Sequence, residues 1–258
     1  MVKSIYLYII FAGLFFSCNN DKPRTSLTNP IYPIPDSTVE SLQRYSYHMM
    51  GYNDSALQFK GTGFFVRYNN KIFFVTAKHT VVPYNTDCIP FRKPDIWTIF
   101  LPDGGLLNPL EINVNVIKDT VKCPYPADVI AIEINNPKNY KIHYMEFSSP
   151  SELPKTLGEI SIDGFQGLNN ITVLNNITHF YSTLSIINQV DSFNYIVTPT
   201  GISITDSLRG LSGAPTFLQD STTKKWAFLG TLVKIDTAKK ELYLVRAEAI
   251  FNEIKRYQ

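Results

Sequence analysis

The sequence predicts an all-β protein. Short runs rich in β-branched and aromatic residues recur along its 258 residues, and clusters of turn residues such as Asp103-Gly104-Gly105 separate them. This alternation is expected of an antiparallel barrel or sandwich. Helical spacing is confined to a stretch after Asp36 and to the end of the chain, so helices should be few.

Residues 1–18 are a predicted targeting segment rather than part of the fold. Lys3 gives a positive start, and the apolar run 5–16 suits a signal peptide but is short for a membrane span. Ser17-Cys18 resembles the end of a bacterial lipobox, which predicts Cys18 as a lipidation site and a lipid-anchored protein of the cell envelope, in the periplasm or on the outer surface. Ordinary secretion with cleavage nearby and an uncleaved anchor are the alternatives.

Residues 19–36 are expected to be a flexible tether. They are poor in apolar side chains and contain four prolines, a composition typical of a linker that holds a domain away from a membrane.

The composition limits which macromolecules, metals and cofactors the protein is expected to bind. A 44% hydrophobic chain can bury a core, and a formal net charge of +2 without a run of like charges does not suggest nucleic acid as a partner. The four histidines are scattered, and neither a Cys-x-x-Cys spacing nor a glycine-rich phosphate loop occurs. We therefore expect no metal and no cofactor.

The first half of the chain reads as one short helix followed by strands. Asp36 or Ser37 should cap a helix over 39–49, because Glu40 completes a capping-box pattern with Ser37. The strand-like runs, two of them joined by an Asn69-Asn70 turn, are 57–67, 71–76, 96–101, 110–117 and 129–134. A tight helical turn over 76–80 should carry His79.

The second half repeats this pattern after a crossover around 135–137 and 150–154. Its strand-like runs are 159–165, 180–189, 195–199, 214–218, 226–235 and 241–246. Helical spacing of Ala249, Ile250 and Ile254 then predicts a C-terminal helix.

The most informative stretch is Leu208 to Phe217, which places Ser212 between Gly210 and Gly213. A serine hydroxyl attacks a carbonyl only with a base to take its proton and with N–H donors for the oxyanion. Gly210 allows the positive φ that such a donor loop requires, so the N–H groups of Gly210 and Ser212 are the candidate oxyanion hole. Taken alone, the stretch is equally well a Gly-Ser-Gly turn between two strands.

Two further segments favour the catalytic interpretation. Gly61-Thr-Gly-Phe leads through two strands to Thr76-Ala-Lys-His79, and Asp128-Val-Ile-Ala-Ile opens an apolar strand. Together with Gly210-Leu-Ser-Gly-Ala-Pro, these motifs resemble the trypsin-like (chymotrypsin-fold) serine peptidases, and most closely their bacterial periplasmic branch. The chain order His, Asp, Ser is that of the chymotrypsin-type triad.

The resemblance implies the fold and its boundaries. It predicts two six-stranded antiparallel β-barrels with a C-terminal α-helix, all within a peptidase domain over 37–258. The N-terminal barrel should cover about 51–137, the C-terminal barrel about 155–246 and the helix 247–257.

The resemblance also assigns roles. Ser212 would be the nucleophile, His79 the general base and then acid, and Asp128 the group that orients the imidazole. Asp119 and Asp87 are alternatives for the carboxylate, but neither precedes an apolar run. Leu211 stands where the digestive peptidases carry an aspartate before the serine, so activation by a new N-terminus is not expected.

The sequence says less about which substrate side chain the site would accept. Asp206 lies six residues before Ser212, where trypsin-type enzymes bind a basic side chain, although it is equally well a solvated loop acid. Leu232, Val233 and Lys234 would form the opposite wall of the pocket and could pair with an extended substrate, and Lys234 could obstruct a cationic side chain.

Cys88 and Cys123 remain after Cys18. In the resembled fold their loops border the same side of the cleft, which implies a disulfide between them. Two buried free thiols are the alternative, because spacing alone does not fix a Cα distance.

The sequence thus predicts a serine endopeptidase that cleaves polypeptide substrates through an acyl-enzyme. An inactive peptidase-fold module that binds peptides or a partner protein is the alternative, and an esterase using the same residues is a third. The oligomeric state is left open.

Overall fold

The structure is a computed structural model. It describes residues 30–35, 38–52, 58–85, 87–101, 110–113, 123, 127–148, 151–153, 157–165, 177–189, 192–200 and 210–256. The predicted targeting segment, Cys18 and most of the predicted tether lie outside these residues. Among the helices described, none is long and apolar enough to cross a membrane.

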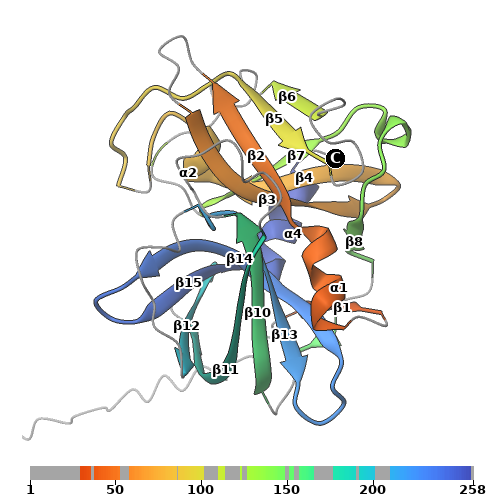
Figure 1. The fold of residues 1–258 in the computed structure, drawn as a ribbon, viewed down its shortest axis with the longest axis vertical. Helices are drawn as coiled ribbons and strands as arrows, with labels where there is room; N and C mark the ends of the chain where they lie inside the picture. The colour runs from red at the N-terminus through yellow and green to blue at the C-terminus, as the bar shows by residue number, and fades with distance from the viewer. Residues whose placement is uncertain are drawn as a thin grey trace, which may run out of the picture.

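The N-terminal sheet contains six antiparallel strands in the order β6-β5-β2-β3-β4-β7 (Figure 1). Asn69 and Asn70 both have positive φ, and they join β3 to β4 in the two-residue hairpin that the sequence predicted. A short strand, β8, adds to β3 in parallel. The strands are β2 (Tyr47–Tyr52), β3 (Gln58–Tyr68), β4 (Lys71–Ala77), β5 (Ile96–Phe100), β6 (Leu110–Asn113), β7 (Val129–Glu133) and β8 (Tyr144–Glu146).

The C-terminal barrel is a closed ring of six antiparallel strands. Its order is β13-β10-β11-β12-β15-β14, and β13 pairs with both β10 and β14, which closes the ring. The strands are β10 (Leu157–Phe165), β11 (Ile177–Gln189), β12 (Asn194–Thr200), β13 (Pro215–Asp220), β14 (Trp226–Asp236) and β15 (Glu241–Arg246). The all-β class and the two antiparallel units are therefore confirmed.

A helix and a shared core join the two units. The C-terminal helix α4 (Ala247–Lys255) contacts β7 of the N-terminal sheet as well as β14 and β15 of the C-terminal barrel. The ring centroids of Phe64 in β3 and Phe228 in β14 lie 5.1 Å apart within one buried cluster that spans the seam between the units. Burial of such large side chains fixes the position of one unit on the other.

The prediction that the tether extends to residue 36 is wrong, because residues within it form β1 (Pro30–Ile34). This strand pairs with β14 and with β9 (Ser151–Glu152). Tyr32 is buried, and its ring stacks on Phe147 at a centroid distance of 4.0 Å. Proline is tolerated where a strand does not need every N–H, so the prolines that suggested a linker are compatible with this short strand.

The predicted helix over 39–49 is also wrong. Only one turn forms, α1 (Val39–Leu42), and its cap is Thr38, whose hydroxyl accepts a 3.4 Å hydrogen bond from the N–H of Ser41. A 3₁₀ turn, η1 (Gln43–Tyr45), follows, and β2 begins at Tyr47, before the expected start of the N-terminal barrel at 51. Pairing of β2 with both β3 and β5 overrides the local helical preference.

Candidate active site

His79 and Asp128 lie beside each other because of one strand register. β4 and β7 are antiparallel, and the last residue of β4, Ala77, is opposite the first residue of β7, Val129. The backbone N–H of Lys78 then donates a 3.2 Å hydrogen bond to the carbonyl of Asp128. His79 follows in the short helix α2 (Lys78–Val81), so both side chains leave the same edge of the sheet.

The Asp128 carboxylate holds His79 at two points. Its Oδ1 accepts a 2.9 Å hydrogen bond from the backbone N–H of His79, and its Oδ2 lies 2.6 Å from the ring Nδ1. An ionised carboxylate only accepts hydrogen bonds, so Nδ1 carries the proton and Nε2 is left as the acceptor. The side chains are 23% and 10% exposed, which leaves the imidazole open to a substrate.

The serine loop, residues 210–214, depends on two glycines with positive φ. Gly210 has φ 97° and Gly213 has φ 90°, and the N–H of Ala214 donates a 2.8 Å hydrogen bond to the carbonyl of Leu211 across the turn. A Cβ at Gly213 would meet the Thr62 carbonyl and the Thr76 hydroxyl. Glycine is therefore required at position 213 both for its φ and for the close approach of β3 and β4.

The serine loop lies at the seam, next to the turn that carries His79. The N–H of Thr62 donates a 3.1 Å hydrogen bond to the carbonyl of Ser212. A Cβ at Gly213 would stand 3.1 Å from the backbone nitrogen of Ala77, two residues before His79. The structure thus brings together the neighbourhoods of all three predicted catalytic residues.

Within the described residues, no hydrogen bond joins the Ser212 hydroxyl to the His79 ring. Catalytic hydrogen bonds are often long in a free enzyme and shorten in the substrate complex, so this geometry is compatible with a triad.

The two candidate oxyanion donors differ from the N–H of Gly213 in their hydrogen bonding to the described backbone. In the serine loop, the N–H of Gly213 donates to the carbonyl of Leu232, whereas the N–H groups of Gly210 and Ser212 have no acceptor among the described residues. An oxyanion hole requires two such N–H groups that are not already bonded within the protein, and among the described residues these two meet that requirement.

The predicted pocket is described only in part. Asp206 lies outside the described residues. Leu232 cannot pair with an extended substrate as expected, because its carbonyl accepts from Gly213 and its N–H donates to the Ala214 carbonyl at 2.9 Å. Val233 lies at a register shift between β14 and β15, and the Lys234 ammonium stands 5.3 Å from the centroid of the Tyr243 ring.

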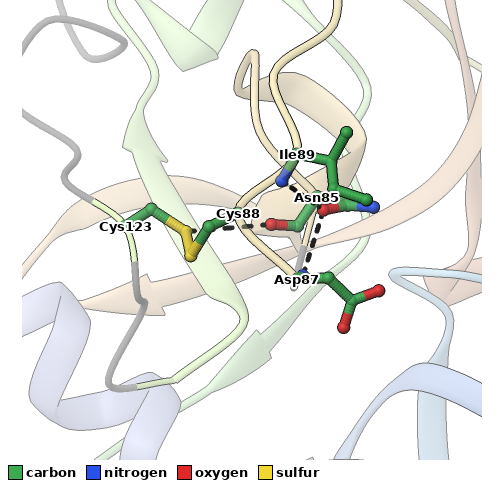
Figure 2. Close-up of a disulfide and its surroundings, with 5 residues drawn as sticks. All are labelled: Asn85, Asp87, Cys88, Ile89 and Cys123. Carbon is green, nitrogen blue, oxygen red and sulfur yellow. Dashed lines mark hydrogen bonds between the residues drawn. A yellow bond between two sulfur atoms is a disulfide. The ribbon is translucent and has the colours of Figure 1, made fainter.

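Cys88 and Cys123 form a disulfide, with their Cα atoms 5.6 Å apart (Figure 2). The bond connects the loop that follows His79 to the segment that precedes Asp128. The first loop is further stabilised by Asn85, whose side-chain oxygen accepts hydrogen bonds from the N–H groups of Asp87, at 3.0 Å, and Ile89, at 2.9 Å. Both flanks of the His79–Asp128 pair are thereby tied together.

Lys78 is a buried charge at the site that the sequence analysis did not single out. Its side chain is 6% exposed, and its Nζ lies 3.9 Å from Oε1 of Glu253 in α4. Burial lowers the pKa of Lys78, while the nearby Glu253 carboxylate opposes that shift. The partner is far away in sequence, so no local pattern could have revealed the pair.

Metal ligands are not gathered at the site. Among the described residues, no group of three or more His, Cys, Asp or Glu side chains could hold a metal ion.

Comparison with known proteins gives a fold and no sequence relative. No protein-family model matches the chain, and no curated protein matches it. The active form of the M. tuberculosis protease Rv3671c is similar in structure, with a TM-score of 0.53, 14% identity and 87% of each chain covered.

Two further structures are similar. A thermostable serine protease from an extremophilic microorganism has a TM-score of 0.52 and 13% identity over 84% of this chain and 96% of that one. A tobacco etch virus protease complexed with product has a TM-score of 0.50 and 13% identity over 84% of this chain and 79% of that one. The chain therefore has the fold of the chymotrypsin-like proteases.

Proposed function

We propose that the protein is a serine endopeptidase in which Ser212, His79 and Asp128 form the catalytic triad. The observation that carries the proposal is the double hydrogen bond of Asp128 to His79 together with the attachment of the serine loop beside it. The protease fold supports the reaction class, whereas the serine type is inferred from the residue at position 212.

In the proposed reaction, the Ser212 Oγ attacks the carbonyl carbon of a peptide while Nε2 of His79 takes the hydroxyl proton. Asp128 stabilises the resulting imidazolium. The negative charge that develops on the carbonyl oxygen would be stabilised by the N–H groups of Gly210 and Ser212. His79 then gives its proton to the leaving amine, and water hydrolyses the acyl-enzyme by the same steps in reverse.

Covalent labelling tests this proposal. A fluorophosphonate should modify the purified protein at Ser212, located by mass spectrometry of the labelled peptide. Labelling should be absent in Ser212→Ala and strongly reduced in His79→Ala, because the hydroxyl is weakly nucleophilic without its base. Ser148→Ala and His143→Ala are matched controls, since both side chains are exposed and lie outside the site.

An inactive peptide-binding module is the second candidate, and the missing hydrogen bond between Ser212 and His79 favours it. A protein that stays unlabelled while trypsin reacts, yet captures peptides from a library, would support the module and contradict the peptidase. An esterase is distinguished by labelling at Ser212 with cleavage of esters and none of peptides.

We further propose that the protein is anchored in a bacterial envelope through a lipid on Cys18. The proposal is supported by the apolar run 5–16 before Ser17-Cys18 and by a disulfide, which is typical of exported proteins. Metabolic labelling with a palmitate analogue should be lost in Cys18→Ala and retained when Cys88 and Cys123 are both serine.

A further inference from the structure

Thr62 in β3 uses every polar atom in hydrogen bonds, and two of these bonds reach the serine loop. Its N–H donates to the Ser212 carbonyl at 3.1 Å, and its hydroxyl donates to the Gly210 carbonyl at 3.0 Å. The same hydroxyl accepts a 2.9 Å hydrogen bond from the N–H of Phe165, the last residue of β10. The Thr62 carbonyl in turn accepts the hydroxyl of Thr76 at 2.7 Å.

This arrangement joins three segments that are distant in sequence. Thr62 belongs to the N-terminal sheet, whereas Gly210 and Phe165 belong to the C-terminal barrel. Thr62 is completely buried, so water cannot replace its hydroxyl without opening the seam. A hydroxyl with one donated and one accepted hydrogen bond is also fixed in rotation.

The bonded carbonyl is that of a proposed oxyanion donor. Gly210 has φ 97°, a conformation that glycine can leave at little cost. Because Thr62 fixes the Gly210 carbonyl, it limits rotation of the peptide that follows and keeps Gly210 in this conformation. The Thr62 N–H fixes the Ser212 carbonyl in the same way, so one residue restrains both ends of the donor pair.

We propose that Thr62 is a positioning residue for the acylation step, and that its hydroxyl maintains the oxyanion-binding conformation of Gly210 across the seam. The inference rests on the proposed function, because it names the residue that aligns the proposed donors. Thr62 touches neither substrate nor the reacting atoms, so its effect is exerted through Gly210 and Ser212.

The test compares Thr62→Val with Thr62→Ser. Valine keeps the shape but neither donates to Gly210 nor accepts from Phe165, whereas serine keeps the hydroxyl. Thr231→Val is the matched control: the Thr231 hydroxyl is also fully buried and donates to a carbonyl of the serine loop, that of Ala214, at 3.0 Å, but it does so within the C-terminal barrel.

We expect Thr62→Val to lower the rate of fluorophosphonate labelling and kcat by about 100-fold, the effect of a small misplacement at a reacting centre. The KM and the pH at which the rate is half-maximal should stay unchanged, because the substrate cleft and the His79–Asp128 pair are intact. Thr62→Ser and Thr231→Val should both react at close to the wild-type rate.

A folded Thr62→Val protein that reacts as fast as wild type would overturn the inference, as would equal losses in Thr62→Val and Thr231→Val. If the valine variant does not fold, Thr62→Ala gives the same comparison. A wild-type protein that no fluorophosphonate labels contradicts the proposed function instead. Amide hydrogen exchange over 210–214 then decides the role of Thr62: exchange about tenfold faster in Thr62→Val and unchanged in Thr62→Ser supports it, and equal exchange contradicts it.

Discussion

The N-terminal sheet and the C-terminal barrel hold their parts of the candidate site in different ways. His79 lies two residues after the end of β4, and Asp128 lies one residue before the start of the neighbouring strand β7. A disulfide connects the loop that follows His79 to the segment that precedes Asp128. The serine loop is held by hydrogen bonds to both units, from Thr62 in β3 and to Leu232 in β14. The His–Asp pair is therefore a local product of one sheet, whereas the position of Ser212 depends on the seam.

The largest effect is expected from Asp128→Asn, which acts on the His79 ring alone. The backbone N–H of His79 keeps the amide oxygen in the place of Oδ1, so the NH₂ group faces Nδ1 and the ring proton moves to Nε2. Because that tautomer cannot accept the serine proton, kcat should fall on the order of 10⁴-fold. Steady-state cleavage of a peptide pool measures the fall.

Glu133→Gln is the control for this variant, because Glu133 lies at the far end of β7 and its side chain forms an exposed pair with Lys71. A kcat in Asp128→Asn within tenfold of wild type would mean that another group orients His79.

The second effect concerns the serine loop and is a loss of stability as well as of activity. In Gly213→Ala, the added Cβ meets the Thr62 carbonyl and the Thr76 hydroxyl, and alanine must adopt φ 90°. Backbone strain and overpacking together should lower the free energy of unfolding by about 3 kcal/mol. Urea denaturation with parallel labelling of Ser212 measures both losses, and a fully stable, reactive alanine variant would disprove the close approach.

The third effect tests the covalent fastening of the His–Asp pair. Replacing both Cys88 and Cys123 by serine releases a crosslink between residues separated by 35 positions, which should lower the free energy of unfolding by about 3 to 4 kcal/mol. Because the strand register remains, the folded variant should still be labelled at Ser212. Urea denaturation with and without reductant measures the loss: reductant should weaken wild type and leave the double variant unchanged.

How much of this arrangement could be predicted from sequence depends on the range of the interactions. The strands around the Asn69-Asn70 turn were predictable, because turn chemistry and apolar runs are local. The pairing of His79 with Asp128 was implied by the resemblance to the trypsin-like peptidases, and the register of β4 and β7 places the two residues side by side. The disulfide could be named as an option, but its formation depends on a Cα distance that only the fold provides.

The predictions that were wrong concern segments that are stabilised by contacts with residues distant in the sequence. β1 looked like a linker because its prolines are local, whereas Tyr32 is stabilised by Phe147 and by pairing with β14. The expected helix over 39–49 has good local spacing, but β2 gains two neighbouring strands instead. The Lys78–Glu253 pair could not be predicted, and neither could the hydrogen bonds of Thr62 to Ser212, Gly210 and Phe165, since each joins residues brought together only by the seam.

The effect that is smallest near neutral pH is a pH dependence that originates at the seam rather than at His79. His48 in β2 is 5% exposed, its ring stacks on Phe165 of β10 at 5.0 Å, and neither ring nitrogen has a hydrogen-bond partner among the described residues. Burial, and secondarily the charge of Lys60, lowers its pKa to about 4. The folded state therefore holds His48 neutral at pH values where the unfolded chain already binds a proton.

The sign follows from this difference. Above about pH 6.5, His48 is neutral in both the folded and the unfolded state, and its contribution to stability is fully present. As the pH falls toward 4, the unfolded state binds a proton first, so the free energy of unfolding decreases by about 3 kcal/mol. In His48→Leu this loss should disappear, whereas His143→Leu, at an exposed position, should behave as wild type. Urea denaturation at pH 7, 5.5 and 4 measures it, and equal pH slopes for wild type and His48→Leu would show that protonation of His48 does not weaken the seam.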